Sequence, residues 1–268
     1  MYYLISILLL LNLSFQSSAQ NLLGCVQNAL GNSDLCFIST PFSIFSNPSA
    51  STNCDAYSLG IYFSPKPFGL SELSTKGTSI TIPVNYGVAG FGYSITGFEL
   101  FKEQKMVVSF ANSINEIFTV GISAFYQNVS ITNYGSDGTI VFLIGSVFSI
   151  NPDLRLAFTI YNPASATYGN IPDQIPVVLN FGVSYRISEI ASVYINNSKE
   201  LNQNNNLCFG ISASPIEWVN FYLGYKSLMN SYSAGISFKQ SMFEVSYATN
   251  SHPELGLTHQ FGLGFRIK

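Results

Sequence analysis

A two-residue alternation of side-chain character runs from Asp55 to the end of the chain. Residues 177–187 show it clearly, because the odd positions are apolar and most even positions are small or polar. Residues 206–214 and 257–267 repeat the pattern. Successive side chains of a β-strand point to opposite faces, so each segment predicts a strand with apolar side chains on one face and small or polar side chains on the other. The sequence therefore predicts an all-β fold.

Composition indicates whether the apolar face of the strands contacts lipid or lies in a water-soluble core. Charged residues are 9% of the chain and aromatic residues 15%, whereas soluble proteins carry roughly 25% charged residues. No stretch after residue 20 has the 18 or so uninterrupted apolar residues of a membrane helix. A strand-rich chain meets lipid only as a closed barrel, because lipid leaves no sheet edge unpaired. The net charge of -3 and the lack of a Lys/Arg run exclude nucleic acid as a partner.

Connection lengths give the expected architecture. Tight turns are predicted at Asn85–Gly87, and longer loops at Phe98–Gln104, Asn128–Gly138 and Pro163–Ile175. Short turns on one rim, long loops on the other and an even strand count are typical of a transmembrane antiparallel β-barrel of the bacterial outer membrane. We expect about 14 strands in a single barrel domain, residues 55–268, with both termini on the periplasmic side. The predicted strands lie near residues 56–64, 78–86, 88–97, 105–112, 116–127, 139–149, 153–162, 176–187, 190–198, 206–214, 217–226, 232–239, 242–249 and 257–267.

The first residues indicate export. Residues 1–19 predict a signal peptide, with an apolar run from Leu4 to Leu13 and small residues before Gln20. A lipoprotein cleavage site with Cys25 as the lipidated residue is the less favoured alternative, because mostly polar residues separate it from the apolar run. The expected location is the outer membrane of a Gram-negative bacterium.

Residues 20–54 have neither strand period nor helix length. Cys25, Cys36 and Cys54 lie there, and an exported chain permits a disulfide between Cys25 and Cys36 or between Cys36 and Cys54. The alternative is that they are small buried residues. Metal ligation is not expected, because the cysteines have no close partners in sequence and the chain has only two histidines.

With this segment in front of a barrel, the chain resembles the FadL-like outer-membrane family, which includes channels for hydrophobic substrates and the PorV-type proteins of Bacteroidota. Residues 24–50 are similar to that family's opening, which ends in an Asn-Pro-Ala string, and the strand estimate agrees. The resemblance implies that residues 20–54 form a hatch, or plug, inside the lumen, marked by Gly24, Gly31, Asn47 and Pro48. The chain departs from the family in Asn-Pro-Ser-Ala, in Gly31-Asn32 and in its terminal Lys268.

A few polar residues fall on the inward parity, that is, on the alternate strand positions whose side chains are expected to point into the lumen. Arg155, Asn180, Arg186 and Glu244 are candidates for fixing the hatch or lining a polar path, because a lipid-facing charge costs roughly 2–4 kcal/mol at the midplane. Arg186 has the alternative of a solvated place at the rim. Lys226 and Arg266 share the inward parity. On the outward parity, aromatic residues near strand ends predict interfacial belts, namely Tyr57, Tyr185, Tyr225, Tyr232 and Phe265.

Two functions fit these observations. In one, the barrel is a passive channel for hydrophobic small molecules. In the other, it is a PorV-like accessory subunit, or a purely structural subunit, of an outer-membrane secretion or assembly complex. Outer-membrane lipid is the expected surrounding, and either small molecules or other subunits are the partners. No glycine-flanked serine or acid-paired histidine indicates catalysis, so we expect neither an enzyme nor a cofactor.

Overall fold

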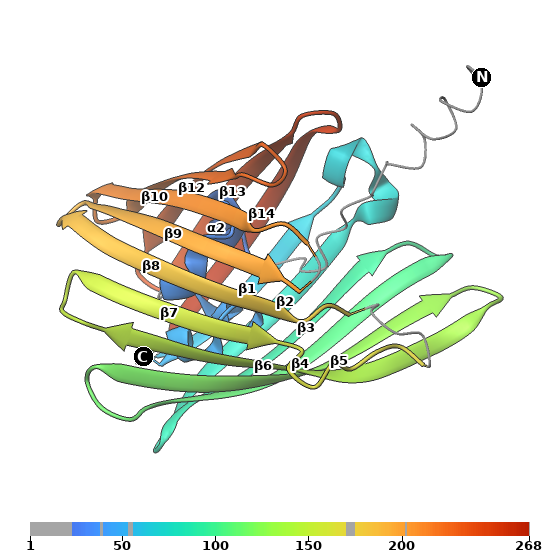
Figure 1. Cartoon of the computed structure of the whole chain (residues 1–268). Coiled ribbons are helices and arrows are strands. Elements are labelled where there is room, and N and C mark those ends of the chain that lie inside the picture. Colours follow the sequence, from blue (N-terminus) through green and yellow to red (C-terminus); the bar gives the residue numbers. More distant parts are fainter. Residues whose placement is uncertain (1–22, 38–39, 53–55, 170–174, 202, 268) are drawn as a thin grey trace, which may run out of the picture.

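A computed structural model describes residues 23–37, 40–52, 56–169, 175–201 and 203–267. Fourteen antiparallel strands form a closed barrel, in which each strand pairs with its neighbours in sequence and β1 pairs with β14 (Figure 1). The prediction of a barrel of about 14 strands is confirmed. The strands are β1 (Tyr57–Ser64), β2 (Thr75–Val84), β3 (Gly87–Gly97), β4 (Phe101–Ser113), β5 (Phe118–Ile131), β6 (Gly135–Ser149), β7 (Leu154–Tyr161), β8 (Val178–Ser188), β9 (Ala191–Glu200), β10 (Asn206–Ile216), β11 (Val219–Lys226), β12 (Ser231–Gln240), β13 (Phe243–His252) and β14 (Gly256–Ile267).

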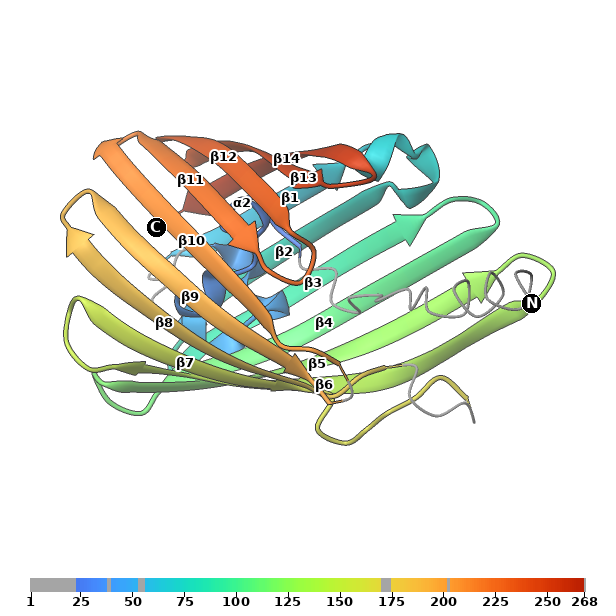
Figure 2. The same ribbon diagram turned by 45° about the horizontal axis from the view of Figure 1, so that its top comes forward.

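The two rims differ less than the sequence predicts. Six connections of two to four residues, such as 85–86 and 189–190, join the strands on one rim, which we call the turn side. The opposite rim, the loop side, carries connections 65–74 and 162–177. The predicted loops Phe98–Gln104 and Asn128–Gly138 are wrong, because only 98–100 and 132–134 lie outside strands. Polar residues there extend β4, β5 and β6 beyond their neighbours on the loop side (Figure 2).

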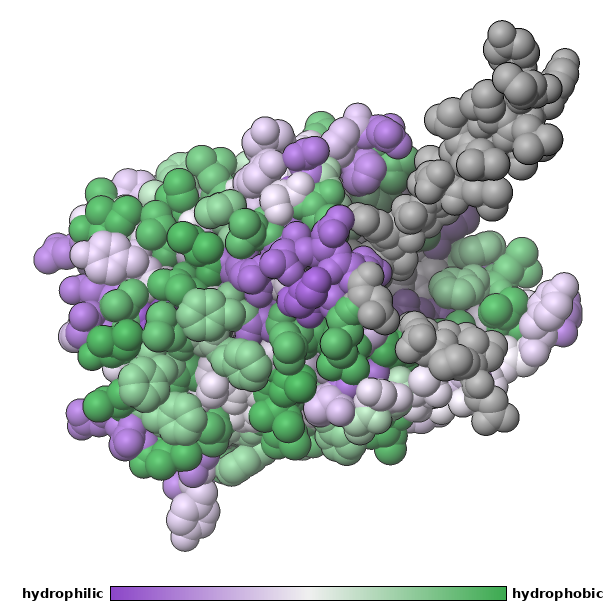
Figure 3. Space-filling model, viewed as in Figure 1, coloured by the Kyte–Doolittle hydropathy of each residue, from purple (hydrophilic) through white to green (hydrophobic). Residues whose placement is uncertain are grey.

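The outer face of the barrel is apolar. Along β1 the outward side chains Tyr57, Leu59, Ile61 and Phe63 are exposed, whereas the residues between them are buried. Hydrophobic side chains cover most of the outer surface visible in Figure 3, with a hydrophilic patch near the end of β9. Aromatic rings pair across strands, as Tyr225 does with Tyr232 at 5.1 Å between centroids. Lipid contact on this face matches the low charge of the chain.

Residues 23–37 and 40–52 lie inside the barrel, where Figures 1 and 2 show their short helices in blue. We call them the interior segment. It consists of α2 (Cys25–Ala29) and the 3₁₀ helices η1 (Asp34–Cys36), η2 (Pro41–Phe45) and η3 (Pro48–Ser51). Two further 3₁₀ helices, η4 (Pro67–Gly69) and η5 (Ser71–Leu73), lie in the β1–β2 connection. No helix among the described residues is long and apolar enough to cross a membrane.

The first and the last described residues lie at different depths of the barrel. Ile267 ends β14 on the turn side, where the sequence predicts the C-terminus. Leu23, the first described residue, instead lines a cavity on the loop side of the interior segment. The predicted signal peptide, residues 1–19, lies outside the described residues, and so does Cys54.

Candidate functional site in the lumen

The interior segment rests on glycines of the barrel wall. Ten of the 14 strands place a glycine on the inner face so close to it that an added Cβ would meet an atom of the segment. These glycines are Gly60, Gly77, Gly90, Gly92, Gly121, Gly145, Gly182, Gly210, Gly224, Gly235 and Gly262, and we call them the glycine ring. Because glycine lacks a side chain, a strand of this kind lets another backbone approach closely.

Two positions show how close this contact is. A Cβ on Gly121 would lie 2.6 Å from the backbone nitrogen of Ser49. A Cβ on Gly224 would overlap the backbone nitrogen of Gly31, which itself has a φ of 64° that favours glycine. In both cases the obstacle is backbone and cannot rotate away. The wall at this level therefore admits no larger residue while the interior segment is in place.

Side chains of the wall satisfy backbone groups of the interior segment. Ser123 Oγ on β5 donates to Ile44 O at 2.8 Å, and Ser233 Oγ on β12 donates to Ala29 O at 3.0 Å. Asn196 Nδ2 on β9 donates to Asn32 O at 2.9 Å. Each such hydrogen bond contributes about 0.5–1.5 kcal/mol. These hydrogen bonds satisfy backbone carbonyl groups of the irregular segment that lie outside any regular hydrogen-bond ladder.

The four residues predicted to mark the hatch all belong to this packed region. Gly24 precedes α2 with a φ of 115°, and Gly31 follows α2 against β11. Asn47 is fully buried, caps η3 by accepting from Ser49 N, and donates from Nδ2 to Leu35 O at 2.8 Å. Pro48 is the first residue of η3. Asn47 thus ties η3 to η1, two parts of the interior segment.

Asp34 is the buried acid of the interior segment. Its Oδ2 accepts a hydrogen bond from Ser46 Oγ at 2.7 Å, whereas its Oδ1 has no partner among the described residues. Burial raises the pKa of this carboxyl, and the hydrogen bond from Ser46 and the positive charge of Lys226 oppose the rise only in part. The protonated form is therefore favoured at this position.

A cavity of about 270 Å³ lies on the loop side of the interior segment. Leu23, Asn28 and Asn32 of the segment border it, and β1, β2 and β10 to β14 contribute the wall. Phe68 of η4 borders it as well, and Phe68 N donates to Thr258 Oγ1 at 3.1 Å. This hydrogen bond holds the β1–β2 connection against β14. The cavity thus lies between the segment and a connection that folds back over the wall.

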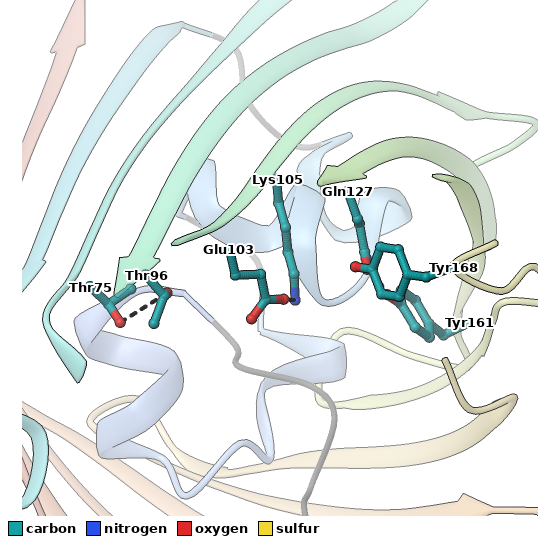
Figure 4. A network of polar contacts seen from close by, with 7 residues as sticks. All are labelled: Thr75, Thr96, Glu103, Lys105, Gln127, Tyr161 and Tyr168. Atoms are coloured by element: carbon teal, nitrogen blue, oxygen red, sulfur yellow. Dashed lines mark hydrogen bonds and ion pairs between the residues drawn. The ribbon is translucent and has the colours of Figure 1, made fainter. Parts of the chain in front are cut away.

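Another part of the inner wall on the loop side carries a polar network (Figure 4). Lys105 on β4 pairs with Glu103 at 2.9 Å. Gln127 on β5 donates to the hydroxyl of Tyr161 and accepts from Tyr168 in the β7–β8 connection at 3.2 Å. The loop-side lumen is therefore polar over these strands as well.

A second cavity, of about 250 Å³, lies on the turn side of the interior segment. Arg155 and Arg186, both predicted lumen residues, line it together with Cys36 and Tyr194. Arg186 is exposed, pairs with Asp153 at 3.6 Å and donates to Pro152 O at 2.8 Å. It is thus a rim residue tied to the neighbouring turn, which is the alternative that the sequence left open.

The other two lumen candidates lie elsewhere. Asn180 on β8 is buried and donates from Nδ2 to Thr159 Oγ1 at 3.0 Å. Glu244 lies at the turn-side end of β13 and borders a separate small cavity together with Cys25. The structure thus brings Arg155 and Arg186 to one cavity and leaves Asn180 and Glu244 apart from it. What any of the four does stays a prediction.

The cysteines do not form the first of the expected pairs. Cys25 and Cys36 are both free and buried; Cys25 lies against Gly262, and Cys36 lies near Arg155. Within the described residues no three His, Cys, Asp or Glu side chains gather as a metal site.

Sequence reasoning missed the residues of the loop-side cavity. The sequence places Lys226 among the inward charges and Gln260 on the polar face of residues 257–267, but it does not indicate a shared cavity for them or a role for Asn250. Their inward parity was the available signal. Nothing in the sequence shows that strands β11, β13 and β14 bring them to one space beside Asn32.

No family model and no curated protein matches the sequence. Solved structures of low sequence identity do share the fold. The CymD monoaromatic hydrocarbon channel aligns with a TM-score of 0.68 at 15% identity, covering 93% of this chain and 99% of that one. The toluene transporter TodX of Pseudomonas putida gives 0.65 at 9%, covering 90% and 96%. A FadL homologue from Pseudomonas aeruginosa gives 0.62 at 8%, covering 91% and 98%. The chain is therefore similar in fold to FadL-type hydrocarbon channels over nearly its whole length.

Proposed function

We propose that the chain is an outer-membrane channel for small, largely apolar molecules, and that residues 20–54 are its hatch. The observation that carries the proposal is the position of the interior segment, which separates a loop-side cavity from a turn-side cavity inside one closed barrel. A barrel that served only as a scaffold would need neither space. The apolar outer face and the fold shared with hydrocarbon channels support the outer-membrane location and the substrate class.

For molecules to pass from one cavity to the other, the interior segment has to move. Its contacts with the wall are close approaches to glycines, single hydrogen bonds and aromatic contacts such as that of Phe45 with Phe125, with no disulfide at Cys25 or Cys36. Each hydrogen bond costs about 1 kcal/mol to break. Displacement of part of the segment is therefore feasible without unfolding the barrel, whose strands are held by continuous ladders.

A reversible tether tests this movement. A Cβ at Gly262 would lie 3.4 Å from the Cβ of Cys25, close to the roughly 3.5–4.5 Å found in disulfides. The variant Gly262→Cys, with Ser246→Ala to make room, should form a disulfide that fixes α2 to β14. We expect uptake of radiolabelled toluene by intact Gram-negative cells to fall at least fivefold on oxidation, from about 1 kcal/mol or more of lost gating freedom, and to recover on reduction.

Ser246→Ala alone, treated with the same oxidant and reductant, is the matched control. Formation of the disulfide is checked by the mobility of the protein on a non-reducing gel. If the oxidised and reduced forms of the tethered protein take up toluene equally, movement of α2 is not part of transport. If neither exceeds cells without the protein, the channel function is wrong.

An accessory role in a secretion or assembly complex is a second prediction. Exposed apolar residues at the loop-side end of the long strands, such as Leu100 and Tyr134, would suit a partner surface. The neighbours named above do not carry such a role in their descriptions, so this role stays without support from them. Purification from native membranes, with identification of stoichiometric partners, tests it.

A further inference from the structure

We propose that the loop-side cavity is a binding site for a small aromatic carboxylate that also carries a hydrogen-bonding group. This inference rests on the proposed channel function and names the class of substrate within it. Three features of the cavity carry it, namely an inward lysine without an ion pair, side-chain amides without partners, and an apolar end of limited size.

Lys226 supplies a cationic group that an anionic ligand can engage. It lies at the end of β11 and borders the cavity. Among the described residues no carboxylate oxygen lies within 4.0 Å of its Nζ, whereas Lys105, the other lysine of the loop-side inner wall considered above, is paired with Glu103 at 2.9 Å. Burial disfavours the charged forms of both Lys226 and Asp34, which lies in the interior segment. A carboxylate bound beside Lys226 would stabilise the ammonium form by pairing with it.

Three amides provide hydrogen-bonding positions. Asn32, Asn250 and Gln260 border the cavity, and their side-chain oxygens are buried without a partner among the described residues. Gln260 is 3% exposed, so its oxygen is withdrawn from bulk water. A buried polar atom without a partner costs about 1–3 kcal/mol. A ligand that donates a hydrogen bond here would remove this cost on binding.

The remaining wall limits the size and character of the ligand. Leu23, Tyr62, Phe68 and Met229 form apolar parts of the lining. The volume of about 270 Å³ lies at the lower end of the roughly 300–1,000 Å³ of ligand pockets, and it corresponds to about nine waters at roughly 30 Å³ each. One substituted aromatic ring fits this space, whereas a long acyl chain exceeds it.

Equilibrium dialysis of the full-length protein in detergent tests the proposal, with protein-free micelles as the blank. Radiolabelled 4-hydroxybenzoate is the probe, and 4-methylphenol, toluene and hexadecanoate are competitors. We expect 4-hydroxybenzoate to bind at least about tenfold more tightly than 4-methylphenol, which lacks the carboxylate; tenfold corresponds to about 1.4 kcal/mol. Hexadecanoate and toluene should compete more weakly than unlabelled probe.

Two lysine variants assign the charge. Lys226→Met should lose the preference for the carboxylate, and Lys226→Arg should retain most of it. Lys105→Met is the matched control, because it removes a lysine that is already paired, and it should bind as the natural protein does. Heat-modifiable migration on a gel verifies that each variant is a folded barrel.

The proposal is overturned if the natural protein does not bind 4-hydroxybenzoate, if 4-methylphenol or hexadecanoate competes equally well, or if Lys105→Met loses as much affinity as Lys226→Met. The channel function fails in a different way, since a tether without effect on uptake leaves these binding constants unchanged.

Discussion

Two levels of the same inner wall differ in how closely the interior segment packs against them. At the level of the glycine ring, wall and interior segment touch backbone to backbone, as Gly121 does with Ser49. Toward the loop side, inward positions of the same strands carry longer polar residues, such as Lys226 two residues beyond Gly224 on β11, and these border a cavity. One level is built for contact and the other leaves room.

The difference indicates which residues serve stability and which serve binding. At the level of the glycine ring, the hydroxyls of Ser123 and Ser233 both donate hydrogen bonds to the interior segment. Cavity residues include unpartnered amides, as at Gln260. Functional sites commonly retain such groups at the expense of stability. Removal of a hydroxyl that is hydrogen-bonded to the interior segment, as at Ser123 or Ser233, should therefore lower stability, whereas removal of an unpartnered amide, as at Gln260, should raise it.

The largest effect is expected at the glycine ring. The double variant Gly121→Leu and Gly224→Leu places side chains where backbone atoms of Ser49 and Gly31 lie. Overpacking costs about 1–3 kcal/mol at each site, and more where backbone blocks relaxation, so we expect a loss of about 4–6 kcal/mol if the segment stays in place. Expulsion of the segment is the alternative response, and it should open the lumen. Thermal unfolding by gel mobility and efflux of small solutes from proteoliposomes measure the two.

Gly264→Leu is the control for this pair. Gly264 lies in β14 near the turn side, and an added Cβ would lie 3.2 Å from the Cβ of Glu244 and 3.8 Å from its backbone oxygen, with no atom of the interior segment among these nearest neighbours. We expect a change below about 1.5 kcal/mol and no leak of solutes. A leak from the control as large as from the double variant would show that the ring has no special role.

The next effect is expected at Asp34, which lies in the interior segment beside both levels. A carboxyl whose pKa is raised on folding binds its proton more tightly in the folded state. Stability is therefore greatest below the unfolded pKa of about 3.9, falls as the pH rises toward the raised value, and stays low above it. Asp34→Asn keeps the hydrogen bond from Ser46 and removes the charge. Above the raised pKa it should be about 1–3 kcal/mol more stable than the natural protein, and its unfolding temperature should no longer fall as the pH rises from the unfolded pKa toward the raised one.

Asp34→Glu and Ser46→Ala sharpen this result. The first keeps the acid, so its pH dependence should remain, and the second removes the one hydrogen bond to the carboxyl, so its stability should fall further above the raised pKa. Equal pH profiles for the natural protein and Asp34→Asn would show that the carboxyl is ionised at little cost, and that Lys226 compensates it fully.

The barrel could be predicted because its cause is local. Strand parity determines which side chains meet lipid, and lipid requires apolar ones, so the alternation in 177–187 and 257–267 was sufficient. Strand ends were less predictable. Lys102, Glu103 and Asn128 were read as loop residues, but strands that rise above the membrane on the loop side tolerate polar residues, so polarity there does not end a strand.

The interior contacts could not be predicted, because they join residues far apart in sequence. Gly224 needs to be glycine because the backbone of Gly31 lies against it. The hydroxyl of Ser233 has a hydrogen-bond acceptor because the carbonyl oxygen of Ala29 lies beside it. The sequence shows small residues on the inward parity without showing what occupies the space beside them. The cavity at Lys226 was missed for the same reason, since it depends on where the interior segment ends.

The smallest effect, and the one of opposite sign, is expected at Gln260. Its amide is 3% exposed and its oxygen has no partner among the described residues. Gln260→Met keeps the length of the side chain and removes the buried polar atoms, so we expect the unfolding free energy to rise by about 1 kcal/mol. The same variant should weaken binding of 4-hydroxybenzoate but not of benzoate, which lacks the hydroxyl.

Thr81→Val is the comparison at the contact level, because Thr81 is fully buried with an unpartnered hydroxyl but does not border the cavity. It should stabilise the barrel without changing either affinity. If Gln260→Met instead destabilises the barrel, the amide has a structural partner, and the division of the wall into a contact level and a binding level does not hold at β14.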